Sequence, residues 1–519
     1  MRRYPDLLSI SVIAALIYWL GLVAFFDLND VDYFWHLETG RWIVENGWTL
    51  PPKDPFSITA DLNGRPFRVY GWIFDGLLYE AFRFGGELAV RVFLGSLMTL
   101  GTLPLYFAVR LSMANSTRSL LVVGLGVIAA YSFFAARPTV VTYAFFNVFL
   151  YLLFKFREDG KLMPLLAIPA IFLVWGNMHP GFLAGFALLA LYVFCDFLDR
   201  YLPVNGSRAT KHRLGLGWAA LLFAFSISAL CVNPYGFSML SDVAGKASAD
   251  ASSIIFEWQS PGFRSFYDRV FLVLSGIWVL MIFMSERRGS WIDLLLPACL
   301  IVMAVSSVRH IPLAVFALVI AVARMSVGVS RPWVSLKVGV STQKHLGSIL
   351  LKDRGEPAGW VKFFAFLAVG ATILLMAPGV QQRQRAALEK NLPVQAAQFV
   401  IDNRLAGHVL NTYHFGGYLL HKFPRSLPLF IDGRYNPFEG QVMNDYIAMT
   451  RLKVDWKERM ARYDFKVAIL ANPDWGLAAV LRQSADFRLV FADENVAVLL
   501  HRSLGRPDVA SVDVSGEKK

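Results

Sequence analysis

Cysteine and charged residues are both scarce in this sequence. The chain has 3 cysteines among 519 residues, and charged residues make up 17% of it, against about 25% in soluble domains. Cys195, Cys231 and Cys299 all lie inside apolar runs without metal-site spacing, which argues against a disulfide framework and a cysteine-bound metal. The shortage of charge argues against an ordinary water-soluble protein.

Acidic residues are fewer than basic ones, 38 against 50, and the net charge is +12. A basic protein can bind nucleic acid, but no compact basic face with interleaved aromatic residues is found in this sequence. Lysine and arginine instead gather between the apolar runs, as the positive-inside rule requires of a membrane protein. We therefore expect no nucleic acid among the partners.

Long apolar runs are abundant. Hydrophobic residues make up 56% of the chain, and the mean hydropathy is +0.48. Runs of about 16 to 22 residues, the length needed to cross a bilayer, predict a mainly α-helical, polytopic membrane protein. The eleven predicted spans are 7–26, 88–109, 119–135, 138–155, 163–177, 180–198, 214–232, 268–285, 291–307, 309–326 and 360–378.

The start of the chain sets the expected orientation. The first run follows Arg2 and Arg3 and has no small-residue cleavage pattern, so we interpret it as a retained signal anchor with a cytoplasmic N-terminus. Most lysines and arginines between spans then fall on the cytoplasmic side. The opposite short loops hold almost none beyond Arg137 and Arg309. We expect a multi-pass protein of the bacterial inner membrane, in contact with membrane lipid.

Composition divides the chain into three predicted parts. Residues 1–378 form a transmembrane module, which includes a first periplasmic loop at 27–87 with helices at 37–46 and at the interface at 71–84. Residues 379–505 alternate helix and strand signals and predict a periplasmic α/β domain. Residues 506–519 are predicted to be disordered. Within the α/β domain we expect helices at 393–403 and 445–463, strands at 408–412, 427–432 and 466–470, and a hairpin at 487–501.

A cluster of acids follows the first span at once. Asp27, Asp30, Asp32 and His36 lie within ten residues, where carboxylates are costly unless water, a metal or a cation meets them. They can be hydrated helix caps. They can also be catalytic, with Asp30 or Asp32 as general base for an incoming hydroxyl or amine and His36 as a polar partner. The same three side chains are the candidate ligands of a divalent cation, Mg²⁺ or Mn²⁺.

Four further loops on the same predicted side carry polar residues, most of them beside span ends. Each residue alone has an ordinary explanation, as a snorkelling arginine or a turn residue. Together they predict a substrate site, in which arginines hold a phosphate through charge-assisted hydrogen bonds and histidines donate a proton to it. The predicted substrate-binding residues are Arg137, Asn177, His179, Asn233, Glu257, Arg309 and His310. The segment Asp432–Pro437 is interpreted as a turn, and a substrate-contacting loop is the alternative.

Four motifs carry a resemblance to a known family. They are Asp30–Arg41 with Asp-Val-Asp-Tyr-Phe-Trp-His at its start, Asp54–Thr59, Gly416–Leu419 and Phe430–Tyr435. With the apolar first span, about eleven spans and the trailing domain, the chain resembles the GT-C superfamily of membrane glycosyltransferases. It is most similar to a bacterial group that uses polyprenyl-phosphate sugars.

The resemblance implies a function. It implies inverting transfer of a sugar from a polyprenyl-phosphate donor to a glycan, lipid or protein acceptor on the outer face. The acid that matches Asp30 or Asp32 would be the base, and Asp27 offers a third candidate. The Trp-Trp-Asp motif of oligosaccharyltransferases is missing from the sequence, which argues against asparagine-linked transfer.

Two other functions remain open. A transporter or flippase for a lipid or glycan would carry charged residues buried within spans, and the predicted span interiors are nearly free of them. A non-catalytic envelope assembly protein would use the outer domain to bind a partner, with the loop acids as caps only.

Overall fold

The chain folds into two compact units in a computed structural model. The helical unit comprises Met1–Phe26 and Val92–Met376, and the sheet unit comprises Asp27–Arg91 and Ala377–Lys519. The structure describes residues 4–59, 62, 66–113, 115–204, 212–244, 256–285, 289–327, 359–424, 426–472 and 476–504. The predicted disordered tail at 506–519 and the basic segments 205–211, 286–288 and 328–358 lie outside these residues.

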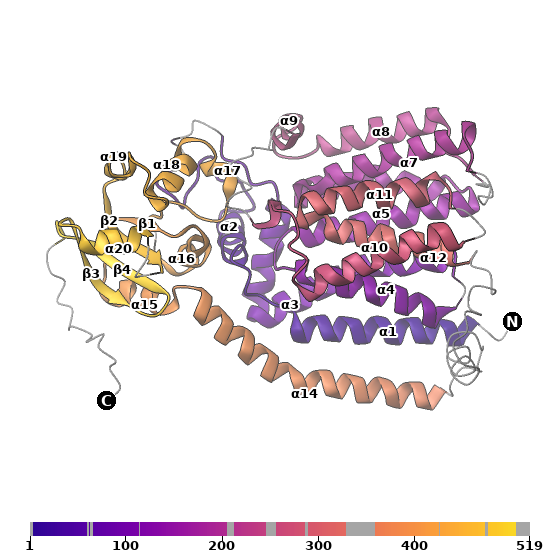
Figure 1. The fold of residues 1–519 in the computed structure, drawn as a ribbon, viewed down its shortest axis with the longest axis horizontal. Helices are drawn as coiled ribbons and strands as arrows, with labels where there is room; N and C mark the ends of the chain where they lie inside the picture. Colours follow the sequence, from indigo (N-terminus) through magenta and orange to yellow (C-terminus); the bar gives the residue numbers. More distant parts are fainter. Residues whose placement is uncertain are drawn as a thin grey trace. The chain divides into compact units, whose positions relative to one another are not determined.

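The helical unit consists of α-helices that lie side by side (Figure 1). Each of the eleven predicted spans coincides with a helix or with part of one, and three of them begin with a short 3₁₀ turn. The helices are α1 (Tyr4–Phe25), α3 (Trp72–Arg110, from Val92 onward), α4 (Ser116–Ala130), α5 (Thr139–Asp159), α6 (Ala167–Met178), α7 (Leu183–Tyr201), α8 (Leu216–Leu230), α9 (Ser238–Ala244), α10 (Phe266–Met284), α11 (Trp291–Ser306), α12 (Ile311–Ser326) and α14 (Gly359–Asn391, up to Met376).

Six helices in the described part of the chain are long and apolar enough to cross a membrane by length and composition. Four apolar helices are shorter, with 10–17 residues each. A helix that is shorter than the bilayer is thick can still belong to a membrane bundle, because the bilayer thins locally or neighbouring helices shield its ends. The mainly helical, polytopic membrane fold predicted from the apolar runs is confirmed.

Helix α12 is the central helix of this unit. Almost all its residues from Ile311 to Met325 are buried, which fits a sequence that is apolar on every side. It packs against α4, α5, α10 and α11. Gly126 allows α4 to approach closely, because a Cβ there would lie 2.5 Å from Val319 Cγ2 of α12. Small residues of this kind are typical of helix contacts in membrane proteins.

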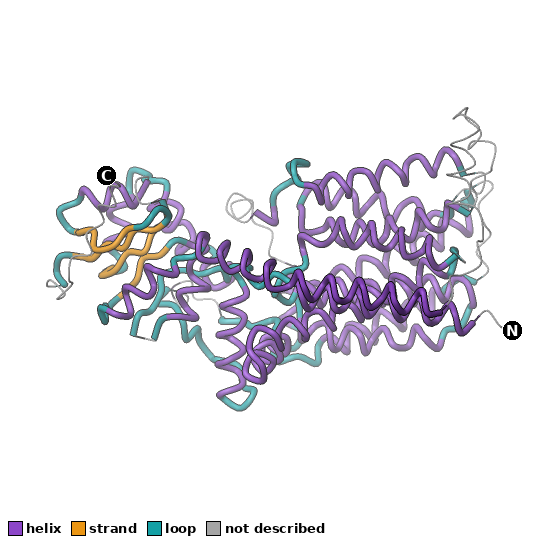
Figure 2. The backbone as a smooth tube through the Cα atoms, turned by 90° about the horizontal axis from the view of Figure 1, so that it is seen from below, coloured by secondary structure: helices purple, strands orange, loops and turns teal. Residues whose placement is uncertain are grey.

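The sheet unit contains one mixed sheet, coloured orange in Figure 2. Its strands are β1 (His408–Asn411), β2 (Phe465–Ala471), β3 (Phe487–Ala492) and β4 (Val496–His501), in the order β1-β2-β4-β3. β1 pairs with β2 in parallel, and the other pairs are antiparallel. The helices of the unit are α2 (Tyr33–Glu45), the start of α3, the end of α14, α15 (Val394–Asp402), α16 (Gly416–Lys422), α17 (Tyr435–Phe438), α18 (Gln441–Thr450), α19 (Trp456–Ala461) and α20 (Gly476–Gln483).

The predicted α/β domain is confirmed, with local differences. The segment 427–432 forms only isolated bridges at Leu429, because Pro424 and Pro428 lack the backbone N–H that a strand needs. The helix expected over 445–463 is two helices, separated near Leu452, whose φ is 52°. The interface helix and the second span are merged in α3 and separated by a kink at Gly85 and Gly86.

The first loop, which was predicted to be part of the transmembrane module, groups with the sheet unit. Helix α2 packs against α16. The backbone N–H of Ile58 donates to the Leu429 carbonyl at 3.1 Å, and the Thr59 hydroxyl donates to the Phe430 carbonyl. Residues almost 400 positions apart are therefore folded together.

Candidate functional site

A large pocket lies at one end of the helical unit. Its volume is about 650 Å³, within the range of small-molecule sites. Aromatic and aliphatic side chains of α5, α7, α11 and α12 form most of its lining, among them Tyr143, Phe146, Leu188 and Leu300. Five of the seven predicted substrate residues also line it, and they come from four separate loops: Arg137, His179, Glu257, Arg309 and His310.

Prolines explain why the chain turns at this end. A residue before proline is disfavoured in helical conformation, and His179, which precedes Pro180, is extended with φ −162° and ψ 138°. Helix α6 therefore ends at Met178, and the chain re-enters the unit as α7. Pro138 similarly stands just before α5, where its missing N–H costs no helical hydrogen bond. Both breaks leave a polar side chain, Arg137 or His179, at the pocket.

His179 is held in one orientation. Its Nδ1 accepts from the Thr142 hydroxyl at 2.6 Å and from the backbone N–H of Gly181 at 3.0 Å, while Trp175 Nε1 donates to Thr142 at 3.0 Å. Since Nδ1 is an acceptor in both bonds, the neutral ring carries its proton on Nε2. Gly181 is required for this closeness, because a Cβ there would lie 2.1 Å from Thr142 Oγ1.

An arginine–glutamate pair lies at the same pocket. Arg137 forms an ion pair with Glu257, and each side chain remains partly exposed, 21% and 27%. Glu257 is fixed through its backbone, since the Ser307 hydroxyl donates to its carbonyl at 2.7 Å. The Arg309 guanidinium lies over the Trp258 ring, 5.2 Å from its centre. Two arginines are therefore positioned beside apolar walls.

Asn177 and Asn233 are outside the pocket lining and serve the backbone. Asn177 Nδ2 donates to the carbonyls of Leu173 and Val232 at 2.9 and 2.8 Å. The Asn233 amide donates to the Leu230 carbonyl at 2.6 Å and accepts from the Tyr235 N–H at 2.7 Å. These contacts make the two amides turn residues.

The first-loop acids lie in the sheet unit. Asp30 Oδ1 accepts from the backbone N–H of Asp32 at 2.8 Å, and Asp32 Oδ1 accepts from Trp35 Nε1 at 3.0 Å. Both residues are half-buried, whereas Asp27 is exposed. Asp32 precedes α2 without capping it through its side chain, so the cap interpretation does not account for its carboxylate.

The third residue of the predicted metal group has another partner. His36 is buried, and its Nδ1 lies 2.7 Å from Asp75 Oδ1. No group of three histidine, cysteine, aspartate or glutamate side chains among the described residues is arranged to hold a metal ion. Asp30, Asp32 and His36 therefore do not fit a three-ligand metal site.

The resemblance motifs meet around a buried arginine, Arg434, which lies in the predicted turn. Arg434 forms two hydrogen bonds with Asp54, at 2.8 and 3.0 Å, and pairs with Asp432 at 2.6 Å. Burial raises the pKa of the Asp432 carboxyl, although Arg434 acts against this shift. Burial alone would lower the pKa of Arg434, but the two carboxylates raise it above its usual value, so the guanidinium stays charged.

Glycines bring the first loop and the later motifs into contact. A Cβ on Gly417 would lie 2.5 Å from the carbonyl oxygen of Val31, the residue between Asp30 and Asp32. A Cβ on Gly433 would lie 2.4 Å from Asp32 Oδ1. The glycines therefore position the backbone and a carboxylate of the candidate base segment.

Gly417→Ala is expected to destabilise the sheet unit by about 1–3 kcal/mol, because the added methyl meets backbone that cannot rotate away. Thermal unfolding of the full-length protein measures this. Gly379→Ala is the control, since nothing lies within 4 Å of its Cβ position in α14 and alanine favours a helix over glycine. Equal stability of the two variants would contradict the close approach at Gly417.

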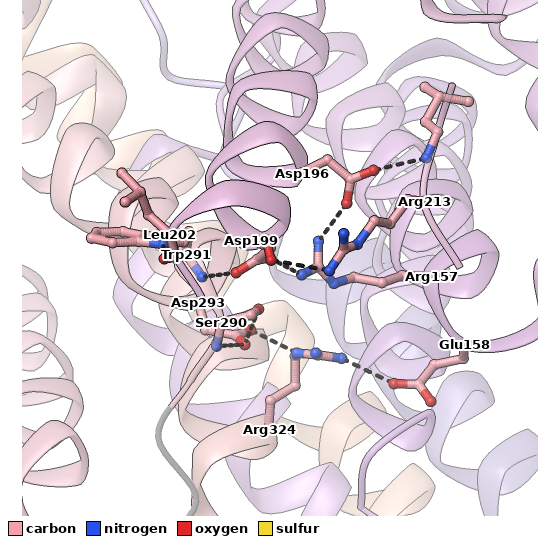
Figure 3. Close-up of polar contacts among 11 residues, drawn as sticks. Arg157, Glu158, Asp196, Asp199, Leu202, Arg213, Ser290, Trp291, Asp293 and Arg324 are labelled. Atoms are coloured by element: carbon pink, nitrogen blue, oxygen red, sulfur yellow. Dashed lines mark hydrogen bonds and ion pairs between the residues drawn. The ribbon is translucent and has the colours of Figure 1, made fainter. Parts of the chain in front are cut away.

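Six charged side chains form ion pairs at the ends of α5, α7, α11 and α12 that lie away from the pocket. They are Arg157, Glu158, Asp196, Asp199, Asp293 and Arg324. Figure 3 shows them together with Arg213, which donates to the Asp199 carbonyl. Arg157 pairs with Asp196 and Asp199, and Arg324 pairs with Asp293 at 2.6 Å. We call this group the helix-end network. The acids in it were not anticipated, but they lie at helix ends and are ion-paired, so they do not form the mid-span charges expected of a transporter.

The fold is similar to that of solved structures, of which two are described. One is the oligosaccharyltransferase AglB of the archaeon Archaeoglobus fulgidus, in complex with an inhibitory peptide and a dolichol-phosphate. It has 10% identity and a TM-score of 0.57 over 98% of this chain and 75% of that chain. The other is the Archaeoglobus fulgidus oligosaccharyltransferase tethered to an acceptor peptide with the NVT sequon, with 12% identity, a TM-score of 0.52, and 96% and 74% coverage.

No protein-family model and no curated protein sequence matches the chain. At 10–12% identity, the structural likeness establishes the fold alone. That fold agrees with the architecture expected from the resemblance, a polytopic helical membrane protein with a trailing C-terminal domain. The same fold can serve more than one function, so the function must be argued from the site.

Proposed function

We propose that this protein is a glycosyltransferase that moves a sugar from a polyprenyl-phosphate donor to an acceptor at the membrane surface. The observation that carries the proposal is the 650 Å³ pocket, in which apolar walls and the side chains of Arg137, His179 and Arg309 occur together. A lipid phosphate needs both features. The GT-C fold supports the same class of reaction.

In this proposal the pocket binds the phosphate end of the donor. The two guanidinium groups offer planar sets of N–H donors that match phosphate oxygens. The Nε2–H of His179 supplies a further hydrogen bond to the charge that develops on the leaving phosphate. The first isoprenoid units lie against the aromatic and aliphatic walls. Glu257 pairs with the Arg137 guanidinium when no donor is present.

The base in this proposal is Asp30 or Asp32. The carboxylate takes the proton of the acceptor hydroxyl or amine, which attacks the anomeric carbon of the sugar. The bond between that carbon and the phosphate oxygen breaks, and polyprenyl phosphate leaves with the electron pair. A single displacement inverts the anomeric configuration. Because no three-ligand metal group is present among the described residues, no step is assigned to a metal.

The acceptor and location are also proposals. The acceptor peptide of the archaeal enzyme belongs to that enzyme, and this chain has no Trp-Trp-Asp motif. We propose a glycan, a lipid or a protein site other than asparagine-linked transfer. The protein is placed in the bacterial inner membrane with the sheet unit in the periplasm, as the distribution of basic residues indicates.

Donor turnover is the experiment that tests the function. Purified wild-type protein is incubated with a panel of radiolabelled polyprenyl-phosphate sugars, and released polyprenyl phosphate is measured. Loss of a general base costs about 10²–10⁴-fold in rate, so either Asp30→Asn or Asp32→Asn should lose turnover to this extent. Asp402→Asn is the control, because Asp402 is an exposed acid of α15 outside the first loop and has no role in the proposed site.

Other outcomes distinguish the alternatives. Wild type that turns over no donor, together with both aspartate variants that retain wild-type behaviour in cells, would favour the transport or assembly function. Turnover that a chelator abolishes would revive the predicted divalent cation. Turnover that persists in Arg137→Gln and Arg309→Gln at unchanged donor KM would remove the pocket from the proposal.

A further inference from the structure

A second cavity lies entirely within the sheet unit. Its volume is about 140 Å³. One wall is a single face of α2, where Glu38, Arg41, Trp42 and Glu45 follow at spacings of three or four residues and therefore point the same way. Phe56 from the first loop and Phe423 after α16 also line the cavity. The lining combines aromatic rings with one cation and several carboxylates.

The polar side chains of this cavity have partners within the sheet unit. Glu38 has a side chain that is only 2% exposed, and it contacts Arg41 Nη2 at 2.5 Å and His421 Nδ1 at 2.7 Å. The ion pair orients the Arg41 guanidinium, whose side chain is 45% exposed and has further N–H donors. Glu45 is exposed and accepts from the Tyr79 hydroxyl at 3.1 Å. Groups held in this way lose little entropy on binding.

These features match one chemical class of ligand, a sugar ring. Vicinal hydroxyl groups both donate and accept, so they pair with a guanidinium and a carboxylate side by side. An aromatic face such as that of Trp42 packs against the apolar C–H face of a ring. The acids of the lining disfavour a phosphate, and the cavity has room for several water molecules, which suits one ring but not an isoprenoid chain.

We propose that this cavity binds a single sugar residue of the glycan substrate. A role of this cavity in sugar transfer rests on the proposed function, whereas binding of the sugar can be measured without any turnover. The cavity shares no lining residue with the phosphate pocket of the helical unit, so the two sites would bind different parts of the substrate. Loss of this binding should weaken substrate affinity without removing the base.

Binding of simple glycosides tests the proposal. Full-length protein in lipid nanodiscs, free of sugar-headed detergent, is titrated with methyl glycosides that include neutral, amino and acidic sugars. Saturation-transfer NMR detects the contacts, and tryptophan fluorescence gives the dissociation constant. At least one glycoside is expected to bind wild type, and Trp42→Leu and Glu45→Gln are each expected to weaken it about tenfold.

Trp48→Leu is the matched control, because Trp48 is also a partly exposed tryptophan of the first loop but does not line the cavity. It should bind as wild type does. Glu45→Gln alters an exposed side chain and keeps the test valid if Trp42→Leu fails to fold. Wild type that binds no glycoside, or binding that both variants leave unchanged, would overturn the proposal. Glycoside binding without donor turnover would count against the glycosyltransferase function alone.

Discussion

Arg434→Met is expected to unfold the sheet unit, with a loss of about 3–5 kcal/mol in the free energy of unfolding. The substitution keeps an unbranched side chain of similar length but removes the only charge shown to pair with Asp54 and Asp432 in the part of the chain that the structure describes. The side chains of both acids are at most 1% exposed. Two carboxylates would then be buried without compensation.

The aromatic residues around Arg434 cannot replace its charge. The guanidinium lies 5.0 Å from the centre of the Phe56 ring, 5.5 Å from Phe67 and 5.9 Å from Phe438. These contacts stabilise a cation but do nothing for a carboxylate. Since the cluster ties the first loop to the segment after β1, its failure should release the loop as well. Thermal unfolding and limited proteolysis of the full-length protein measure both effects.

Two variants make this prediction specific. Arg451→Met removes an exposed arginine of the same unit and should leave stability nearly unchanged. Asp54→Asn and Asp432→Asn, added to Arg434→Met, should recover part of the loss, because a neutral buried cluster avoids the cost of unpaired charge. A stable Arg434→Met protein would show that the cluster is not buried as described.

The sequence was informative where the physical signal is local. An apolar run of sufficient length predicts a membrane helix wherever it occurs, which is why the eleven spans coincide with helices. The alternation of strand and helix signals after residue 379 likewise identified β1, β2, β3 and β4. Local turn chemistry was also read correctly at Asp432, whose Oδ1 accepts from the Arg434 N–H at 3.0 Å.

Pairings across long sequence separations carried no such signal. Arg434 and Asp54 are 380 residues apart, and nothing in either segment identifies the other as its partner. For the same reason, nothing in the first loop indicated that it packs with residues after 377, so it was assigned to the transmembrane module. The predicted topology placed Arg137, His179 and Arg309 on one side of the membrane, and the structure shows all three at one pocket. The topology also placed Asn177 there. The sequence could not distinguish Asn177 from the pocket residues, because its hydrogen bond to the Val232 carbonyl is visible only in three dimensions.

Arg157→Leu is the second variant for which we expect a large loss, about 3–5 kcal/mol, in this case of the helical unit. Arg157 belongs to the helix-end network and has a side chain that is 1% exposed. It contacts Asp196 at 3.4 Å and is also paired with Asp199. Leucine would fill much of the space but leave both acids of α7 without their arginine.

The network also orders the backbone at the helix ends. Asp196 Oδ2 accepts from the N–H of Leu214 at 2.7 Å, which holds the chain that enters α8. Asp199 Oδ1 accepts from the N–H of Trp291 at 3.0 Å, which holds the start of α11. Displacement of these acids therefore affects three helices. Because α5, α7 and α11 also line the pocket at their opposite ends, their spacing there should change too.

Lys155→Leu is the control for Arg157→Leu, since Lys155 lies two residues away on the same helix. Its side chain is 35% exposed, and its ion pair with Asp159 is long, at 4.0 Å. It should shift the unfolding temperature little, because exposed ion pairs contribute about 0–1 kcal/mol. Arg157→Lys keeps the charge but not the planar set of donors, so an intermediate loss is expected. Equal unfolding temperatures of Arg157→Leu and Lys155→Leu would contradict the prediction. They would mean that Asp196 and Asp199 become protonated or pair with other groups, and that the network is not needed to keep the helices in place.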